Sequence, residues 1–123
     1  MSRRLSYDTV AFDVRDNTTM LFFARTSEEG DIQDYLLLMR TVEADFEETF
    51  SIEANEQQTD GHDVMKEAAL LGNTLTLTFN EPVKILGNVR ELVLTFDETE
   101  SNLSSMESGA FRVLGDYLKG GNA

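Results

Sequence analysis

The chain has 123 residues, of which 41% are apolar, and a formal net charge of −13. These values indicate one soluble globular domain spanning residues 1–123 rather than a disordered segment. There is no cysteine, which excludes disulfides, thiolate metal sites and cysteine nucleophiles.

Most of the negative charge lies in one stretch of the chain. Residues 28–63 hold twelve carboxylates and one cation, Arg40, so this stretch accounts for −11 of the total −13. Such a field attracts a basic protein and repels nucleic acid and anionic membrane, so we expect a protein partner and neither of the others. A salt-rich habitat is the alternative explanation, but it predicts acids spread evenly along the chain.

The N-terminal residues and the apolar runs bear on location. Residues 1–8 include two arginines but no apolar core, so they do not predict a secretory signal. The longest strongly apolar run, residues 35–39, is far shorter than a membrane-spanning helix. We therefore expect a cytoplasmic protein.

The N-terminal third of the chain alternates apolar and polar residues, which is the period of a half-buried strand. Residues 9–15 and 19–24 both show this period and are separated by the turn signal Asp16-Asn17. They predict a hairpin, followed by a polar loop at residues 27–31.

The middle of the chain combines one strongly apolar segment with polar connections. Residues 35–40 are apolar on both faces, which predicts a central strand covered on both sides, with a short helix as the alternative. Residues 50–54 alternate again and predict another strand. Residues 55–63 are polar and predict a loop with a turn at Asp60-Gly61.

Further strands are predicted beyond residue 63. Residues 64–71 contain helix formers but run into Gly72-Asn73, a hairpin signal, so we favour a strand and keep a helix as the alternative. Residues 75–79 and 92–96 have similar patterns and are expected to be antiparallel neighbours. Pro82 is expected to end the pairing of the first of these two strands.

The chain is predicted to end in a helix that Ser104 or Ser105 caps and Gly120-Gly121 stops. Its apolar stripe consists of Ala110, Phe111, Leu114, Tyr117 and Leu118. Together the segments predict an α+β fold: a mostly antiparallel β-sheet of about six to eight strands with a C-terminal α-helix packed on one face.

No motif in the chain indicates catalysis. His62 is the only histidine and no second histidine or nucleophile motif accompanies it, so an exposed loop histidine is the preferred interpretation. Residues 97–102 place oxygens at alternate positions but lack the glycine that an EF-hand needs at position six. With 23 acids, no single carboxylate pair points to glycoside hydrolysis. We expect no enzyme activity, no cofactor and no metal.

Three segments occur in a recognisable order: YLLLMR at 35–40, FSIEANEQ at 50–57 and LGNTLTL at 71–77, before a final strand and helix. In this order the chain resembles the immunity protein 10 family of bacterial polymorphic-toxin systems. The resemblance implies a cytoplasmic α+β protein that binds and blocks a toxin domain, often encoded beside it, without enzyme activity or cofactor. It assigns no binding residue at any position.

The partner-binding residues are therefore predicted from charge alone, in the segment 43–63. They are Glu43, Asp45, Phe46, Glu47, Glu48, Glu53, Glu56, Asp60 and Asp63. Carboxylates on this surface would steer a basic toxin domain, with Phe46 as an apolar anchor. For each residue the alternative is a solvated acidic face with Phe46 in the core. A second hypothesis is a homo-oligomeric structural or small-ligand-binding domain, for example a homodimer, that has no catalytic activity and pairs through a sheet edge.

Overall fold

The computed structural model describes residues 2–42 and 48–119. In these residues, ten strands form two five-stranded sheets, which confirms the predicted α+β, mostly antiparallel class but divides the strands between two sheets. The first sheet has the order β1-β9-β8-β7-β10 and contains Ser2–Tyr7, Val89–Phe96, Thr74–Val83, Met65–Leu71 and Leu118–Lys119. The second sheet has the order β2-β3-β4-β5-β6 and contains Thr9–Arg15, Thr18–Thr26, Ile32–Val42, Glu48–Ala54 and Gln57–Asp60.

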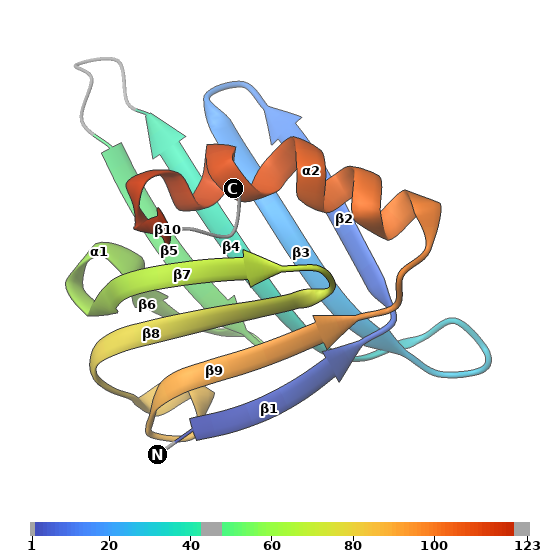
Figure 1. The fold of residues 1–123 in the computed structure, drawn as a ribbon, viewed down its shortest axis with the longest axis horizontal. Coiled ribbons are helices and arrows are strands. Elements are labelled where there is room, and N and C mark those ends of the chain that lie inside the picture. Colours follow the sequence, from blue (N-terminus) through green and yellow to red (C-terminus); the bar gives the residue numbers. More distant parts are fainter. Residues whose placement is uncertain (1, 43–47, 120–123) are drawn as a thin grey trace.

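The C-terminal helix and the first sheet both lie on one face of the second sheet (Figure 1). The helix, α2, spans Glu100–Leu114, and a single turn, α1, spans Gly61–Val64 between β6 and β7. Short 3-10 turns occupy Lys84–Leu86 and Gly115–Tyr117. Neither α-helix of the described residues is long and apolar enough to span a membrane.

The core lies between the two sheets and beneath α2. Because side chains in a strand point alternately to its two faces, every second residue of the central strands is buried. The fully buried side chains include Leu21, Phe23, Leu36, Leu38 and Ile52 from the second sheet, Ala68, Leu75, Leu77, Leu92 and Leu94 from the first, and Val113 and Leu114 from α2. Strand alternation, which the sequence shows directly, therefore sets the composition of the core.

Two of the predicted strand pairings are confirmed. The β2–β3 hairpin is antiparallel and closes with Arg15 opposite Thr18. Strands β8 and β9 are antiparallel neighbours with Leu75 opposite Leu94. The prediction that Pro82 ends the pairing of β8 is wrong. The pairing loses its regular register after Thr78 and resumes at Val83, which lies opposite Val89.

Two further segments contain strands, one predicted as a strand with a helix as the alternative and the other predicted as a loop. The strand prediction for residues 64–71 is confirmed, since β7 occupies all but the first of these residues. The prediction of a loop at residues 55–63 is wrong, because Gln57–Asp60 form β6 and pair with β5. Asn55 and Glu56 both adopt positive φ, at 49° and 73°, and this two-residue turn folds a polar segment back as a strand.

Strand β4 is the middle strand of the second sheet, but the described residues cover only one of its faces, whereas cover on both was predicted. Leu36 and Leu38 face the core and are fully buried, whereas Leu37 and Met39 face away from it and stay partly exposed. Within the described residues, α2 and the first sheet both lie on the other face (Figure 1). An apolar run on both faces of a strand does not by itself show that both faces are covered.

Helix α2 begins and ends earlier than predicted. Its N-cap is Thr99, whose Oγ1 accepts a hydrogen bond from the Asn102 backbone N–H at 3.1 Å, so neither Ser104 nor Ser105 caps it. The helix ends at Leu114 because Gly115 adopts a positive φ of 57°. The predicted stop at residues 120–121 lies outside the described residues.

The buried stripe of α2 also differs from the predicted one. Phe111 is 67% exposed, and Tyr117 and Leu118 lie beyond the helix. The buried residues are Asn102, Met106, Gly109, Ala110, Val113 and Leu114. The shift follows from the close approach of the helix to the sheet at Gly109, where an added Cβ would lie 2.5 Å from Phe12 Cδ1.

Gly109→Ala is therefore expected to destabilise the fold, although alanine is the better helix former. Overpacking against Phe12 costs about 1 to 3 kcal/mol, while the gain in helix propensity is about 1 kcal/mol. We expect the free energy of unfolding, measured in urea, to fall by about 1 kcal/mol. Ser108→Ala, one residue earlier and exposed, is the control and is expected to raise it slightly. A stabilising Gly109→Ala would contradict the close packing.

Candidate functional site

The structure describes five of the nine predicted partner-binding residues. Glu43, Asp45, Phe46 and Glu47 lie outside the described residues. Glu48 begins β5, Glu53 lies near its end, and Glu56 follows in the turn to β6. Asp60 ends β6 and Asp63 lies in α1. All five are therefore on the β5–β6 side of the second sheet, and all but the half-buried Glu53 are exposed.

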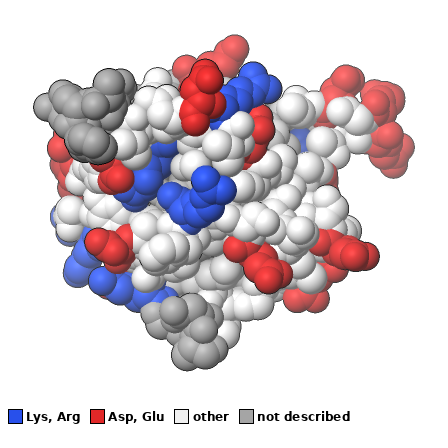
Figure 2. Space-filling model, turned by 90° about the horizontal axis from the view of Figure 1, so that it is seen from above, with Lys and Arg blue, Asp and Glu red and all other residues white. Residues whose placement is uncertain are grey.

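These carboxylates form two groups at opposite ends of the β5–β6 hairpin, because the hairpin brings the ends of its strands together. Glu48 and Asp60 are at one end, while Glu53 and Glu56 are at the turn. Figure 2 shows one face of the molecule on which Asp and Glu side chains are dispersed and Lys and Arg side chains lie between them, near the middle and toward the edges. On that face the carboxylates are therefore not gathered into one acidic patch.

Arg40, the only cation of the acidic stretch, points inward from β4. Its side chain is 12% exposed, and its guanidinium carbon lies 5.2 Å from the centre of the Phe50 ring. Nε donates to the Val113 carbonyl at 2.7 Å and Nη2 to the Leu114 carbonyl at 3.2 Å, while Nη1 pairs with Glu48. The guanidinium therefore satisfies carbonyls at the C-terminus of α2, where a cation also opposes the helix dipole.

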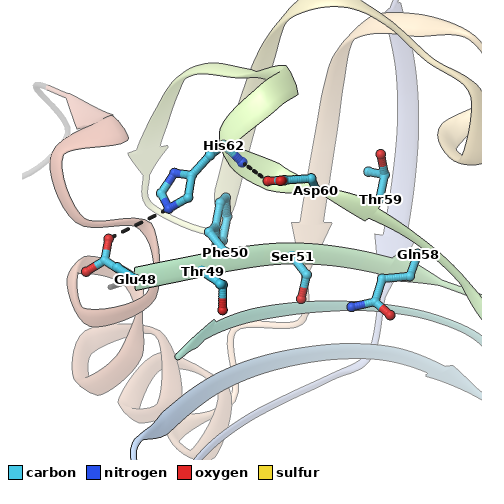
Figure 3. Close-up of a pocket in the computed structure, with 8 residues that line it drawn as sticks. All are labelled: Glu48, Thr49, Phe50, Ser51, Gln58, Thr59, Asp60 and His62. Atoms are coloured by element: carbon cyan, nitrogen blue, oxygen red, sulfur yellow. Dashed lines mark hydrogen bonds and ion pairs between the residues drawn. The ribbon is translucent and has the colours of Figure 1, made fainter. Parts of the chain in front are cut away.

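A surface hollow of about 430 Å³ lies beside this cluster, between the start of β5 and the end of β6 (Figure 3). Phe50 and His62 point toward each other on one side of the hairpin, and their rings are 5.7 Å apart. His62 Nδ1 lies 2.8 Å from the Tyr117 hydroxyl, and Nε2 lies 3.8 Å from Glu48. Asp60 accepts a hydrogen bond from the His62 backbone N–H at 2.9 Å.

Glu48, Asp60 and His62 are the titratable side chains that line this hollow, and Tyr117 lies next to His62. Burial raises the pKa of Tyr117, which keeps its hydroxyl protonated and makes it a poor nucleophile. The contact between His62 Nε2 and Glu48 is longer than a hydrogen bond. Among residues 2–42 and 48–119, no three His, Asp or Glu side chains are grouped so that they could hold a metal ion. The side chains around His62 orient its ring and connect β5, α1 and the 3-10 turn Gly115–Tyr117.

The other end of the hairpin is organised around Tyr35. Its hydroxyl donates to Glu53 Oε2 at 2.6 Å and accepts a hydrogen bond from the Glu56 backbone N–H at 2.9 Å. Asn55 donates to Asp34 at 2.8 Å, and Arg25 pairs with the same carboxylate at 3.3 Å. The carboxylate of Glu53 is thereby held in one orientation on the face of the sheet that points away from α2.

The hydrogen bond to Glu53 also raises the pKa of Tyr35. Glu53→Gln is expected to lower that pKa, because the neutral amide no longer favours the protonated phenol. The measurement is the alkaline titration of Tyr35 followed by the NMR shift of its ring carbon Cζ. Glu107→Gln, on α2, is the control and should leave the titration unchanged. An unchanged Tyr35 pKa in Glu53→Gln would contradict the contact.

Sequence reasoning missed the outer face of the second sheet, by which we mean the exposed side of β2, β3 and β4. Its apolar side chains are Ala11, Met20, Phe22, Tyr35, Leu37 and Met39. The signal was present in the apolar run Met20-Leu21-Phe22-Phe23, which supplies apolar residues to both faces of β3. Alternation is a weak guide in such a run, because both faces look equally suited to burial.

No protein-family model matches the chain, and no curated protein is significantly similar to it. The resemblance to the immunity protein 10 family stays a prediction.

Proposed function

We propose that the chain is an immunity-type inhibitor, which binds a basic toxin domain through its acidic surface and neutralises it without catalysis. The observation that carries the proposal is the inward orientation of Arg40, the single cation among residues 28–63. The guanidinium of Arg40 binds carbonyls of α2 and the carboxylate of Glu48. The other charged side chains of the acidic stretch are carboxylates, and these are what its surface presents to a partner. The action would take place in the cytoplasm, where such a toxin domain would otherwise act.

The described carboxylates have different roles in this proposal. Glu48 pairs with Arg40 and Asp60 caps α1, so both also serve the fold. Glu56 and Asp63 are exposed, and Glu53 is held by Tyr35. Exposed carboxylates speed the approach of a basic protein, whereas a carboxylate held in one orientation can form a fixed ion pair. Glu53, Glu56 and Asp63 are therefore the best residues for a test.

The test uses the purified, inactivated protein encoded by the gene adjacent to that of this chain. We expect a stable complex, and neutralisation of the active form of that protein. The triple variant Glu53→Gln, Glu56→Gln, Asp63→Asn is expected to bind at least about tenfold more weakly. The matched control removes three exposed carboxylates elsewhere, by Glu81→Gln, Glu98→Gln and Glu107→Gln, and should bind nearly as well as the wild type.

Two outcomes would overturn the proposal. One is the absence of any complex with the adjacent protein. The other is equal affinity of the two triple variants, which would show that net charge alone matters. Light scattering of the chain by itself addresses the competing hypothesis, because a tight symmetric dimer without a protein partner would favour a homo-oligomeric domain.

A further inference from the structure

The outer face of the second sheet is an apolar surface that no described element covers in Figure 1. Cross-strand pairing places Ala11, Phe22 and Leu37 in one row and Met20 beside Met39 in the next. Their sequence neighbours Leu21 and Leu38 are fully buried, so this row points to the opposite side. Phe22, Leu37 and both methionines are partly exposed. A contiguous apolar patch on a monomer often marks an interaction site.

The patch is hollowed rather than flat. One hollow of about 470 Å³ includes Tyr35 and Ile32 in its lining, and another of about 420 Å³ includes Met20 and Leu37. Phe22 lines both, so its ring divides them. Ile32, at the rim, is 56% exposed. Side chains of a partner can insert into the two hollows on either side of this aromatic ring.

The charges around the hollows indicate the kind of partner. Asp34 and Glu56 line one hollow, and Asp13 and Arg15 line the other. Arg15 is paired with Asp13 at 2.9 Å and Arg25 with Asp34 at 3.3 Å, so the net negative charge of the rim comes from Glu56 and the neighbouring Glu53. Together with the total of −13, this charge opposes a second copy of the chain and favours a basic protein.

We propose that a basic protein docks on the outer face of β2, β3 and β4, with apolar groups over Phe22 and Leu37 and cations against the carboxylates at the rim. An apolar centre inside a polar rim is the usual arrangement of a protein interface. This inference rests on the proposed function and names the surface that performs it. The carboxylate of Glu53, oriented by Tyr35 on the same face, would be one of the rim contacts.

The methionines allow a direct test by NMR with the methyl groups labelled. Met20 and Met39 lie on the outer face, whereas Met65 and Met106 are 3% exposed and report on the core. The probe is the inactivated product of the adjacent gene. We expect it to shift or broaden the resonances of Met20 and Met39 and to leave those of Met65 and Met106 in place.

Two variants test the face by affinity. Ala11→Arg adds a bulky cation to an exposed position without removing a core side chain, and Phe22→Ser removes the ring between the hollows. Each is expected to weaken binding at least about tenfold. Phe111→Ser is the matched control, because this ring is 67% exposed on α2, and it should bind as the wild type does. Unshifted Met65 and Met106 resonances will show that each variant is folded.

The outcomes separate this inference from the proposed function. If the adjacent protein binds but Met20 and Met39 do not respond and Ala11→Arg binds normally, the docking surface is wrong and the inhibitor role stands. If no protein binds, both fail. If the Met20 and Met39 resonances shift with concentration of the chain alone while its mass doubles, a second copy covers the face and the inference is overturned.

Discussion

Replacing Asn102 by leucine is expected to lower the free energy of unfolding by about 3 to 5 kcal/mol. Asn102 is 4% exposed and is the only buried polar side chain among the described residues. Its Oδ1 accepts the Val10 N–H at 2.9 Å, and its Nδ2 donates to the carbonyls of Asp8 and Asp97, both at 2.9 Å. Leucine would leave three backbone groups without partners, and each costs about 1 to 3 kcal/mol when buried.

The position of Asn102 in the fold explains why this loss of stability is expected to be large. Asn102 is in the first turn of α2, and its amide joins the helix to the β1–β2 junction and to the end of β9. Urea unfolding followed by circular dichroism measures the loss. Asn80→Leu is the control, since Asn80 is exposed and donates a single hydrogen bond at 3.3 Å, and it should cost less than about 1 kcal/mol. An Asn102→Leu variant as stable as that control would contradict the account.

The second large effect is expected at the other end of α2. Arg40→Met should lower the free energy of unfolding by about 2 to 3 kcal/mol, because charge-assisted hydrogen bonds to the Val113 and Leu114 carbonyls are lost. Arg40→Lys keeps the charge but not the planar fork, so an intermediate loss is expected. Urea unfolding at constant pH provides the measurement.

Arg112→Met is the matched control for this prediction. Arg112 is exposed on the last turns of α2, with its guanidinium carbon 5.3 Å from the centre of the Phe12 ring. An exposed contact of this kind contributes about 0.5 to 1 kcal/mol. Equal losses in Arg40→Met and Arg112→Met would show that the inward orientation of Arg40 adds nothing to stability. That result would also weaken the argument from the inward orientation of Arg40, the single cation of residues 28–63.

The sequence predicted the strands whose alternation is clean and missed those that depend on turns or tertiary contacts. Residues 75–79 alternate without interruption, residues 92–96 do so except at Val93, and their pairing is confirmed. Strand β6 has the polar sequence QQTD and forms because Asn55 and Glu56 make a tight turn, which composition alone did not reveal. The sequence predicts a serine as the N-cap of α2 instead of Thr99, because Thr99 lies in a polar segment that resembles a loop.

For the candidate site, the sequence predicts that the charge is negative but not how the side chains are arranged. Counting carboxylates located the acidic stretch, but the partners of Arg40 on α2 are 73 and 74 residues away in sequence and cannot be read from composition. The outer face was missed for a related reason. An apolar strand such as β4 shows two apolar faces, and only the arrangement of α2 and the first sheet determines which face they bury.

The most direct test of the account is the salt dependence of association with the product of the adjacent gene. If exposed carboxylates on the second sheet attract a basic partner, the association rate constant should fall at least about tenfold between about 20 mM and about 500 mM NaCl. The dissociation rate should change much less. An association rate that does not depend on salt would contradict the claim that charge on this surface selects the partner.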